Sequence, residues 1–118
     1  MYKKTNNIKV IYPNLLITEC PHYENHIWAS DFTYLSFQGK VVYVATVMDL
    51  FTRKIVGLSV YTTHATQLVL SVFMNALLEN SRPAIFHSDN GSEYNAEVFV
   101  ETVHTVGTII SRSTPGCP

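Results

Sequence analysis

The sequence predicts a mixed α/β domain in which three antiparallel strands precede alternating helices and strands. Residues 27–62 contain three runs of apolar and β-branched residues separated by short polar turns, which is typical of consecutive paired strands. Apolar residues then recur at three- and four-residue spacing over 65–77, as on one face of a helix. Short apolar runs at 84–88 and 108–111 flank a second helical stretch, which favours parallel strands joined by helices.

Composition indicates a single packed domain. Of the 118 residues, 47% are hydrophobic and only 14% are charged, which is too apolar for a disordered chain. No apolar run reaches the roughly 18 residues that a membrane span needs, and no signal-peptide core follows the N-terminus. Cys20 and Cys117 form no Cys-x-x-Cys pair, so neither a disulfide framework nor a zinc ribbon is expected. We expect a soluble cytoplasmic protein.

Charge limits how the protein could hold a nucleic acid. Eight Lys and Arg residues against nine Asp and Glu residues give a net charge of −1. A domain that held DNA by neutralising phosphates alone should be basic. If the chain binds DNA, metal ions or further domains must supply much of the attraction.

The first strand is expected at Ile27–Tyr34, and its alternation places Asp31 on the face opposite Trp28 and Phe32. Gly39 suits a hairpin turn. The almost unbroken apolar run at 40–50 predicts a strand covered on both faces. A charged turn then leads to a third strand at Ile55–Thr62; its charged residues are Asp49, Arg53 and Lys54.

The helix over 65–77 is expected to begin at an N-cap, Thr63, and to end before Pro83. Asn95 is the predicted N-cap of the second helix, and Gly107 its C′ residue. Residues 1–24 show no sustained period and are interpreted as an arm or linker ahead of a core over 25–118. Ahead of the first strand, one cysteine and two histidines lie close together in the sequence: Cys20, His22 and His26. Their spacing matches no known zinc-binding pattern.

Two aspartates interrupt strand-like runs and suggest one metal site. Asp31 lies within the first strand, and Asp89 comes where the apolar run 84–88 stops. Hard carboxylate oxygens suit Mg²⁺ or Mn²⁺, and a bound cation keeps neighbouring carboxylates ionised. Taken alone, Asp89-Asn90-Gly91 would also make an ordinary turn.

Four segments, in this order and on these elements, resemble the catalytic core of retroviral integrases and bacterial insertion-sequence transposases, the DDE superfamily. The segments are Trp28–Tyr34, Val47–Gly57, His87–Tyr94 and Ser111–Pro118. The resemblance implies a ribonuclease-H-like fold with a mixed five-stranded sheet and flanking helices. It also implies a triad of two aspartates and a glutamate, of which Asp31 and Asp89 match the aspartates.

The resemblance implies DNA transposition by metal-dependent strand transfer. Two Mg²⁺ or Mn²⁺ ions about 3.5–4 Å apart would activate the attacking oxygen and stabilise the leaving one. Asp31 would bridge the ions, and Asp89 would hold one of them. Water would cleave at a transposon end, and the freed 3′ hydroxyl would attack target DNA. The implied partners are DNA and a second copy of the chain, and the implied location is the bacterial nucleoid.

The implied glutamate lies on a further helix, beyond the Gly-Cys-Pro segment with which this sequence ends. We therefore expect a core that is incomplete at its C-terminus, in which Glu93, Glu97 and Glu101 do not replace the third acid. Whether it is an active enzyme stays open at this point. The alternatives are a truncated remnant that folds and self-associates without catalysis, and a ribonuclease-H-like nuclease that acts on RNA–DNA hybrids.

Secondary candidates have competing interpretations. Arg53, Lys54 and Arg112 are candidate phosphate contacts, with a purely charged turn as the alternative for the first two. His87 is interpreted as a histidine satisfied at a strand end rather than as a catalytic group.

Overall fold

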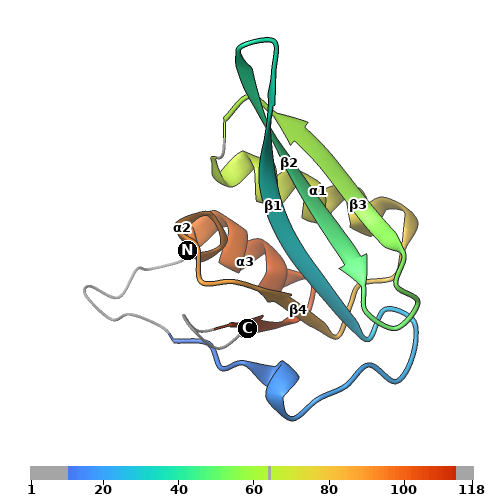
Figure 1. Ribbon diagram of the computed structural model, residues 1–118. Coiled ribbons are helices and arrows are strands. Elements are labelled where there is room, and N and C mark those ends of the chain that lie inside the picture. The colour runs from blue at the N-terminus through green and yellow to red at the C-terminus, as the bar shows by residue number, and fades with distance from the viewer. Residues whose placement is uncertain (1–10, 64, 114–118) are drawn as a thin grey trace.

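The structure is a computed structural model that describes residues 11–63 and 65–113. Its five strands form one sheet in the order β3-β2-β1-β4-β5, with three helices and one 3-10 turn (Figure 1). The elements are η1 (Leu15–Ile17), β1 (Ile27–Phe37), β2 (Lys40–Asp49), β3 (Ile55–Tyr61), α1 (Thr66–Glu79), β4 (Ile85–Ser88), α2 (Ser92–Asn95), α3 (Glu97–Thr105) and β5 (Ile109–Arg112). The predicted mixed five-stranded sheet and its element order are confirmed.

The direction of each strand follows from its connection. A two-residue turn with positive φ at Gln38 (51°) and Gly39 (76°) joins β1 to β2, which suits an antiparallel hairpin. A short turn also makes β2 and β3 antiparallel, whereas β4 and β5 are each reached through helices and run parallel to β1 and β4 respectively. The meander and the crossovers therefore meet at β1, the central strand.

Both long helices cover the same face of the sheet. The apolar stripe of α1 is buried, and its members are Leu68, Val69, Val72, Phe73 and Ala76. A Cβ atom on Gly57 of β3 would lie 2.7 Å from the carbonyl oxygen of Val72, so the helix approaches β3 to a distance that only glycine allows. Figure 1 shows α1 behind β2 and β3.

An aromatic cluster fills the space between the sheet and the helices. The ring of Phe73 on α1 lies 5.0 Å from that of Phe86 on β4 and 6.0 Å from that of Phe99 on α3. Trp28 and Tyr94 extend the cluster through edge-on contacts to Phe73 and Phe99. Each buried aromatic side chain removes about 150–250 Å² from water, so this cluster dominates the packing of the core.

The other face of β2 and β3 stays open in the described part of the chain. Leu58 and Val60 on β3 are 55% and 56% exposed, whereas Ala45 and Val47, which face α1, are fully buried. On that face of β2, however, the side chains from Val42 to Met48 are half-buried, so the cover predicted for both faces of the strand at 40–50 is partial among the described residues. An unbroken apolar run shows that both faces of a strand are apolar. It does not show whether other elements cover both of them.

Both predicted helix N-caps were wrong. Helix α1 begins after Ala65, which makes no side-chain capping bond, rather than after Thr63. Residues 92–95 form their own turn, α2, and the N-cap of α3 is Ala96. Asn95 instead donates its amide to the carbonyl and side-chain oxygens of Asn90, at 3.2 and 2.8 Å. A cap contributes only about 1 kcal/mol, so packing of the helices on the sheet decides where they begin. The predicted C′ position of Gly107 is confirmed by its φ of +84°.

Asp49 organises the turn between β2 and β3 from a buried position. Its carboxylate accepts hydrogen bonds from the backbone N–H groups of Asn25 and Phe51 and from the hydroxyl of Thr52, at 3.1–3.2 Å. The predicted turn is confirmed, but Asp49 is fully buried and stabilises the backbone, while Arg53 and Lys54 are exposed. None of the helices among residues 11–63 and 65–113 is both long and apolar enough to cross a membrane. Cys117 and the end of the fourth motif, 114–118, lie outside the described residues.

Candidate active site

Asp31 and Asp89 each lie two residues beyond the paired part of β1 and β4. The two strands are parallel, with Ile27 opposite Ile85 and Ala29 opposite His87. Asp31 is within β1, and Asp89 follows β4 directly. Because side chains alternate along a strand, Asp31 belongs to the face opposite the buried Trp28 and Ser30, away from α1. Both side chains are exposed.

Each carboxylate is fixed by one local hydrogen bond. The Oδ1 atom of Asp31 accepts from the N–H of Phe32 at 2.9 Å, and the Oδ1 atom of Asp89 accepts from the N–H of Gly91 at 2.8 Å. Among the described residues, nothing donates to either Oδ2 atom. Since an ionised carboxylate offers about four acceptor sites, both acids keep capacity for a cation.

A buried hydroxyl pair lies on the core side of the site. The hydroxyl groups of Ser30 and Tyr94 are 3.0 Å apart. Burial raises the pKa of Tyr94 well above its usual value, and the charges of Asp89 and Asp31 raise it further, against a lowering by the Ser30 bond and by Arg112. Tyr94 therefore stays neutral at physiological pH.

Arg112, whose charge interacts with that of Asp89, lies in the interior. It ends β5 opposite Ser88, is 2% exposed, and donates from Nη2 to the carbonyl oxygen of Tyr94 at 2.7 Å. Burial lowers the pKa of Arg112 to about 10, although coulombic interactions with Tyr12, Tyr94 and Asp89 act to raise it. The guanidinium group thus remains charged at neutral pH but does not face solvent, where a phosphate would meet it.

The other two predicted phosphate contacts are not beside the aspartates. Arg53 and Lys54 are exposed in the turn after β2, where Asp49 pairs with Trp28 near the amino end of β1. Asp31 lies instead near the middle of β1, and Asp89 lies just after the carboxyl end of β4.

No third acid joins the pair within the described residues, where no group of three His, Cys, Asp or Glu side chains could hold a metal ion. Glu93 belongs to α2, and Glu97 and Glu101 belong to α3. Two exposed carboxylates with unused oxygens still fit a hard divalent cation, which commonly takes one or two carboxylates and completes its shell with water and phosphate.

His87 is satisfied as expected. Its ring is half-buried, and Nδ1 lies 2.8 Å from the hydroxyl of Ser111 on the neighbouring strand. Burial, and secondarily the charge of Arg112, lower the pKa of His87. The histidine is therefore neutral at physiological pH and connects β4 to β5.

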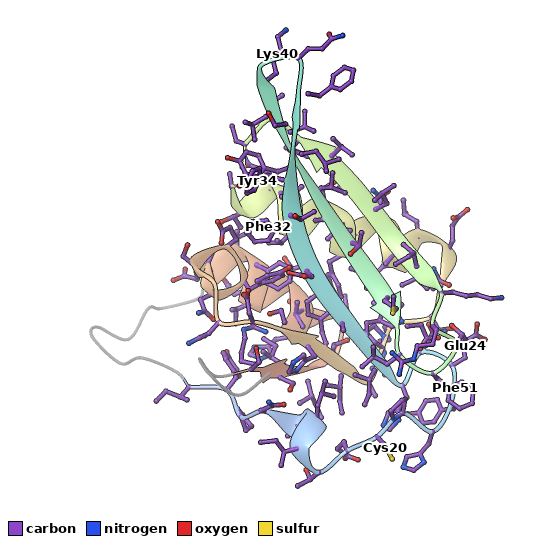
Figure 2. The ribbon with its side chains drawn as sticks, in the orientation of Figure 1. Cys20, Glu24, Phe32, Tyr34, Lys40 and Phe51 are labelled. Carbon is purple, nitrogen blue, oxygen red and sulfur yellow. The ribbon has the colours of Figure 1, made fainter. Side chains whose placement is uncertain are left out.

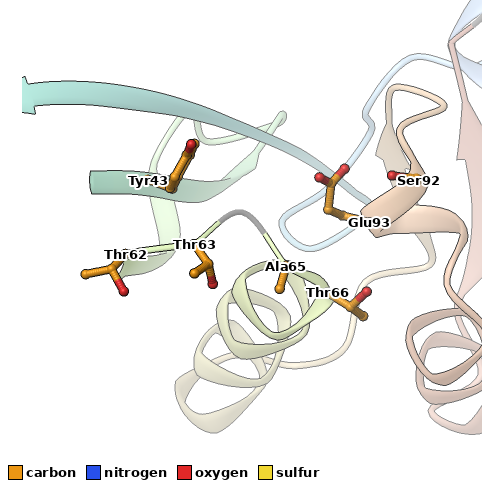
Figure 3. A pocket seen from close by; sticks show the side chains of 7 residues that line it. All are labelled: Tyr43, Thr62, Thr63, Ala65, Thr66, Ser92 and Glu93. Atoms are coloured by element: carbon orange, nitrogen blue, oxygen red, sulfur yellow. The ribbon is translucent and has the colours of Figure 1, made fainter. Parts of the chain in front are cut away.

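An open groove of about 640 Å³ adjoins the turn after Asp89 (Figure 3). It runs between the amino end of α1 and α2, and five of its seven lining residues carry a hydroxyl group. The lining residues are Tyr43, Thr62, Thr63, Ala65, Thr66, Ser92 and Glu93.

A five-stranded mixed sheet with one aspartate on β1 and another directly after the parallel strand β4 is the arrangement of the ribonuclease-H-like, integrase-core class. The sequence profile of the family "Integrase core domain" matches residues 21–118. The chain belongs to this family.

Its curated relatives are transposases of insertion sequences. It is 35% identical over 96 residues to the transposase of IS904 from Lactococcus lactis, covering 80% of this chain and 38% of that protein. It is 34% identical over 94 residues to the transposase of IS629 from Shigella sonnei, covering 78% and 31%. The chain thus spans about a third of the length of these relatives.

Solved structures share the fold. The catalytic core domain of HTLV-2 integrase in complex with magnesium, in its dimeric form, superposes with a TM-score of 0.70 at 21% identity, covering 75% of this chain and 61% of that one. Its trimeric form gives a TM-score of 0.67 at 24% identity, covering 78% and 60%. At these identities the likeness establishes the architecture alone.

Sequence reasoning missed the support beneath the aspartates. Ser30 precedes Asp31, and Tyr94 follows Asp89 by five residues. The sequence does contain an indication of this contact. Tyr94 is an aromatic residue within an otherwise polar stretch, Asn90–Asn95, which is typical of a turn that packs on the core.

We expect Tyr94→Phe to destabilise the domain by about 1 kcal/mol at pH 7, because the Ser30 hydroxyl loses its partner. Burial holds the pKa of Tyr94 above that of an unfolded tyrosine, so its contribution to stability is complete below about pH 10 and is lost as the pH rises through the folded value. The difference in stability between the wild type and Tyr94→Phe should therefore shrink above pH 10. Urea unfolding at pH 7, 9 and 10.5 measures it.

Tyr34→Phe is the matched control, since Tyr34 is 65% exposed on the projecting hairpin (Figure 2). Equal stabilities of the two variants at pH 7, with no change in their difference at alkaline pH, would contradict the assigned role of Tyr94.

Proposed function

We propose that this chain is catalytic-core sequence of an insertion-sequence transposase and takes part in metal-dependent DNA strand cleavage and strand transfer. The observation that supports the proposal is the parallel pairing of β1 with β4, which ends at Ala29 and His87, two residues before Asp31 and Asp89. The family membership and the similarity to insertion-sequence transposases support DNA as the substrate. A transposase of this kind would work on the bacterial nucleoid.

Asp31 and Asp89 would hold Mg²⁺ or Mn²⁺. The magnesium bound by the HTLV-2 integrase core supports this choice, as do the hard oxygen donors and their exposure. When bound, the ions would polarise the phosphodiester and make the attacking oxygen a stronger nucleophile. Asp31 would bridge two ions, and Asp89 would bind one of them. Ser30 and Tyr94 would keep the turn and the strand in register beneath the carboxylates.

The net charge of this chain does not favour DNA binding. At −1 it gives no overall attraction for the negatively charged phosphates, so part of the attraction must come from other groups. The bound cations would neutralise the aspartates, and Arg53 and Lys54 could contact phosphates farther along a duplex because both are exposed. The complete site would also include a glutamate beyond the described residues.

Loss of metal binding in two variants tests the site. We expect Asp31→Asn and Asp89→Asn each to weaken Mn²⁺ binding at least tenfold, because each removes one charged ligand from the same cation. Isothermal titration calorimetry measures the affinity, and an exposed acid at the end of α1 provides the control Glu79→Gln. The proposal fails if the wild type binds no ion, or if Glu79→Gln weakens binding as much as the aspartate variants.

Substrate choice separates the transposase from a ribonuclease-H-like nuclease. With Mn²⁺ present, nicking of DNA duplex supports the proposed function, and preferential cleavage of an RNA–DNA hybrid would replace it with the nuclease alternative.

Self-association without catalysis is a second candidate, favoured by the open face of the sheet. Apolar side chains that are about half exposed gather on β3 and the adjoining hairpin; they are Leu35, Ile55, Leu58 and Val60. Water contact with such a surface is unfavourable by about 25 cal/mol per Å², so a second copy could cover it.

We expect Leu58→Lys to weaken self-association, because it places a charge in the centre of that surface. Sedimentation equilibrium measures the monomer–dimer balance. Leu78→Lys is the control, since Leu78 is 79% exposed but lies on α1, across the sheet. A strictly monomeric wild type, or an effect of Leu78→Lys alone, would contradict pairing through the open face.

A further inference from the structure

We propose that Arg112 is a positioning residue whose buried guanidinium group holds the turn that carries Asp89 against β5. This inference rests on the proposed role of Asp89 as a metal ligand, but its structural part can be tested without metal. In this role Arg112 would act on the site through the backbone of the turn and would not touch DNA.

The hydrogen bonds of Arg112 reach the turn at its far end. Nη2 donates to the carbonyl oxygen of Tyr94 at 2.7 Å, and Nε donates to the side-chain oxygen of Asn95 at 3.4 Å. The amide of Asn95 in turn donates to the carbonyl and side-chain oxygens of Asn90. A continuous path of hydrogen bonds therefore runs from Arg112 through Asn95 to the residue next to Asp89.

The strand pairing fixes the near end of the same turn. Arg112 lies opposite Ser88 in the β4–β5 ladder, and the N–H of Ser113 donates to the carbonyl of Ser88 at 2.9 Å. Asp89 follows directly. The end of β5 thus holds the turn at Ser88 through the backbone and at Tyr94 and Asn95 through the Arg112 side chain.

The environment of the guanidinium group indicates a defined position. It lies 5.5 Å from the ring centroid of Tyr12 and 5.9 Å from that of Tyr94, and its own Nη1 donates to the carbonyl of Ser111. Across the described ranges no salt bridge with a carboxylate accompanies these contacts. Burying a cation is costly unless hydrogen bonds and aromatic faces compensate, and an apolar side chain would fill this space at lower cost. A buried arginine at this position is therefore consistent with a role in binding carbonyl oxygens.

The lead-in segment completes this enclosure. The N–H of Arg112 donates to the carbonyl of Pro13 at 3.0 Å, and the N–H of Leu15 donates to the hydroxyl of Ser111 at 2.9 Å. Tyr12 is thereby held over the guanidinium group. An arm interpreted from sequence as a linker therefore packs against the strand that supports Asp89.

Hydrogen exchange of the metal-free protein tests the positioning directly. In Arg112→Lys we expect the amides of Gly91, Tyr94 and Asn95 to exchange about tenfold faster, because an ammonium group cannot reproduce the two directed bonds to Tyr94 and Asn95. Amides of α1 should keep their wild-type rates. Arg82→Lys is the matched control, since Arg82 is exposed and donates to a single carbonyl, that of Gly107, at 3.1 Å.

Metal affinity tests the consequence for the site. We expect Arg112→Lys to weaken Mn²⁺ binding about tenfold at a temperature where circular dichroism shows a folded chain, whereas Arg82→Lys leaves it unchanged. In Arg112→Ala, guanidinium at millimolar concentration should restore binding, and methylammonium should not. If Arg112→Ala does not fold, the lysine variant alone decides.

Two results would overturn the inference. One is an unchanged exchange rate in the Asp89 turn of Arg112→Lys; the other is a uniform increase across the whole chain, which would give Arg112 a general stabilising role. If the wild type binds no Mn²⁺, the proposed function fails, while the exchange rates still decide whether Arg112 holds the turn.

Discussion

The parallel pairing of β1 with β4 is the interaction on which the site depends. A shift of this register by one residue would send Asp89 to the opposite face of the sheet from Asp31. The pairing is short, so it needs support from outside the ladder. That support comes from the core side, where Phe86 packs between Phe73 and Phe99 and the Ser30 and Tyr94 hydroxyl groups meet.

The rest of the fold maintains this pairing by covering one face and leaving the other accessible. Helix α1 can cross from β3 to β4 only because Gly57 allows it to lie against the edge of the sheet. Asp49 closes the β2–β3 turn and also accepts from the N–H of Asn25, just before β1 begins. Beyond β4, the Arg112 side chain joins β5 to the turn after Asp89. The open face then carries Asp31 and an exposed apolar surface.

The order of elements could be predicted because it depends on local periodicity and on motif residues. The helix starts could not, since a capping preference at Thr63 or Asn95 is small beside the packing of an apolar helix face. The burial of Arg112 was hidden for a different reason. Its surroundings combine Tyr12, a hundred residues earlier, with Tyr94, and no local pattern reports such a contact. The apolar run at 40–50 likewise predicted its strand but not which face would be covered.

The most direct test of the account is paramagnetic broadening by Mn²⁺ in the NMR spectrum of the protein. The N–H groups of Phe32 and Gly91 donate to Asp31 and Asp89, so they report on the two carboxylates separately. If Asp31 and Asp89 bind the same ion, substoichiometric Mn²⁺ should broaden both amide signals together. Broadening of only one of them, or broadening centred on His22 and His26 with both unaffected, would contradict it.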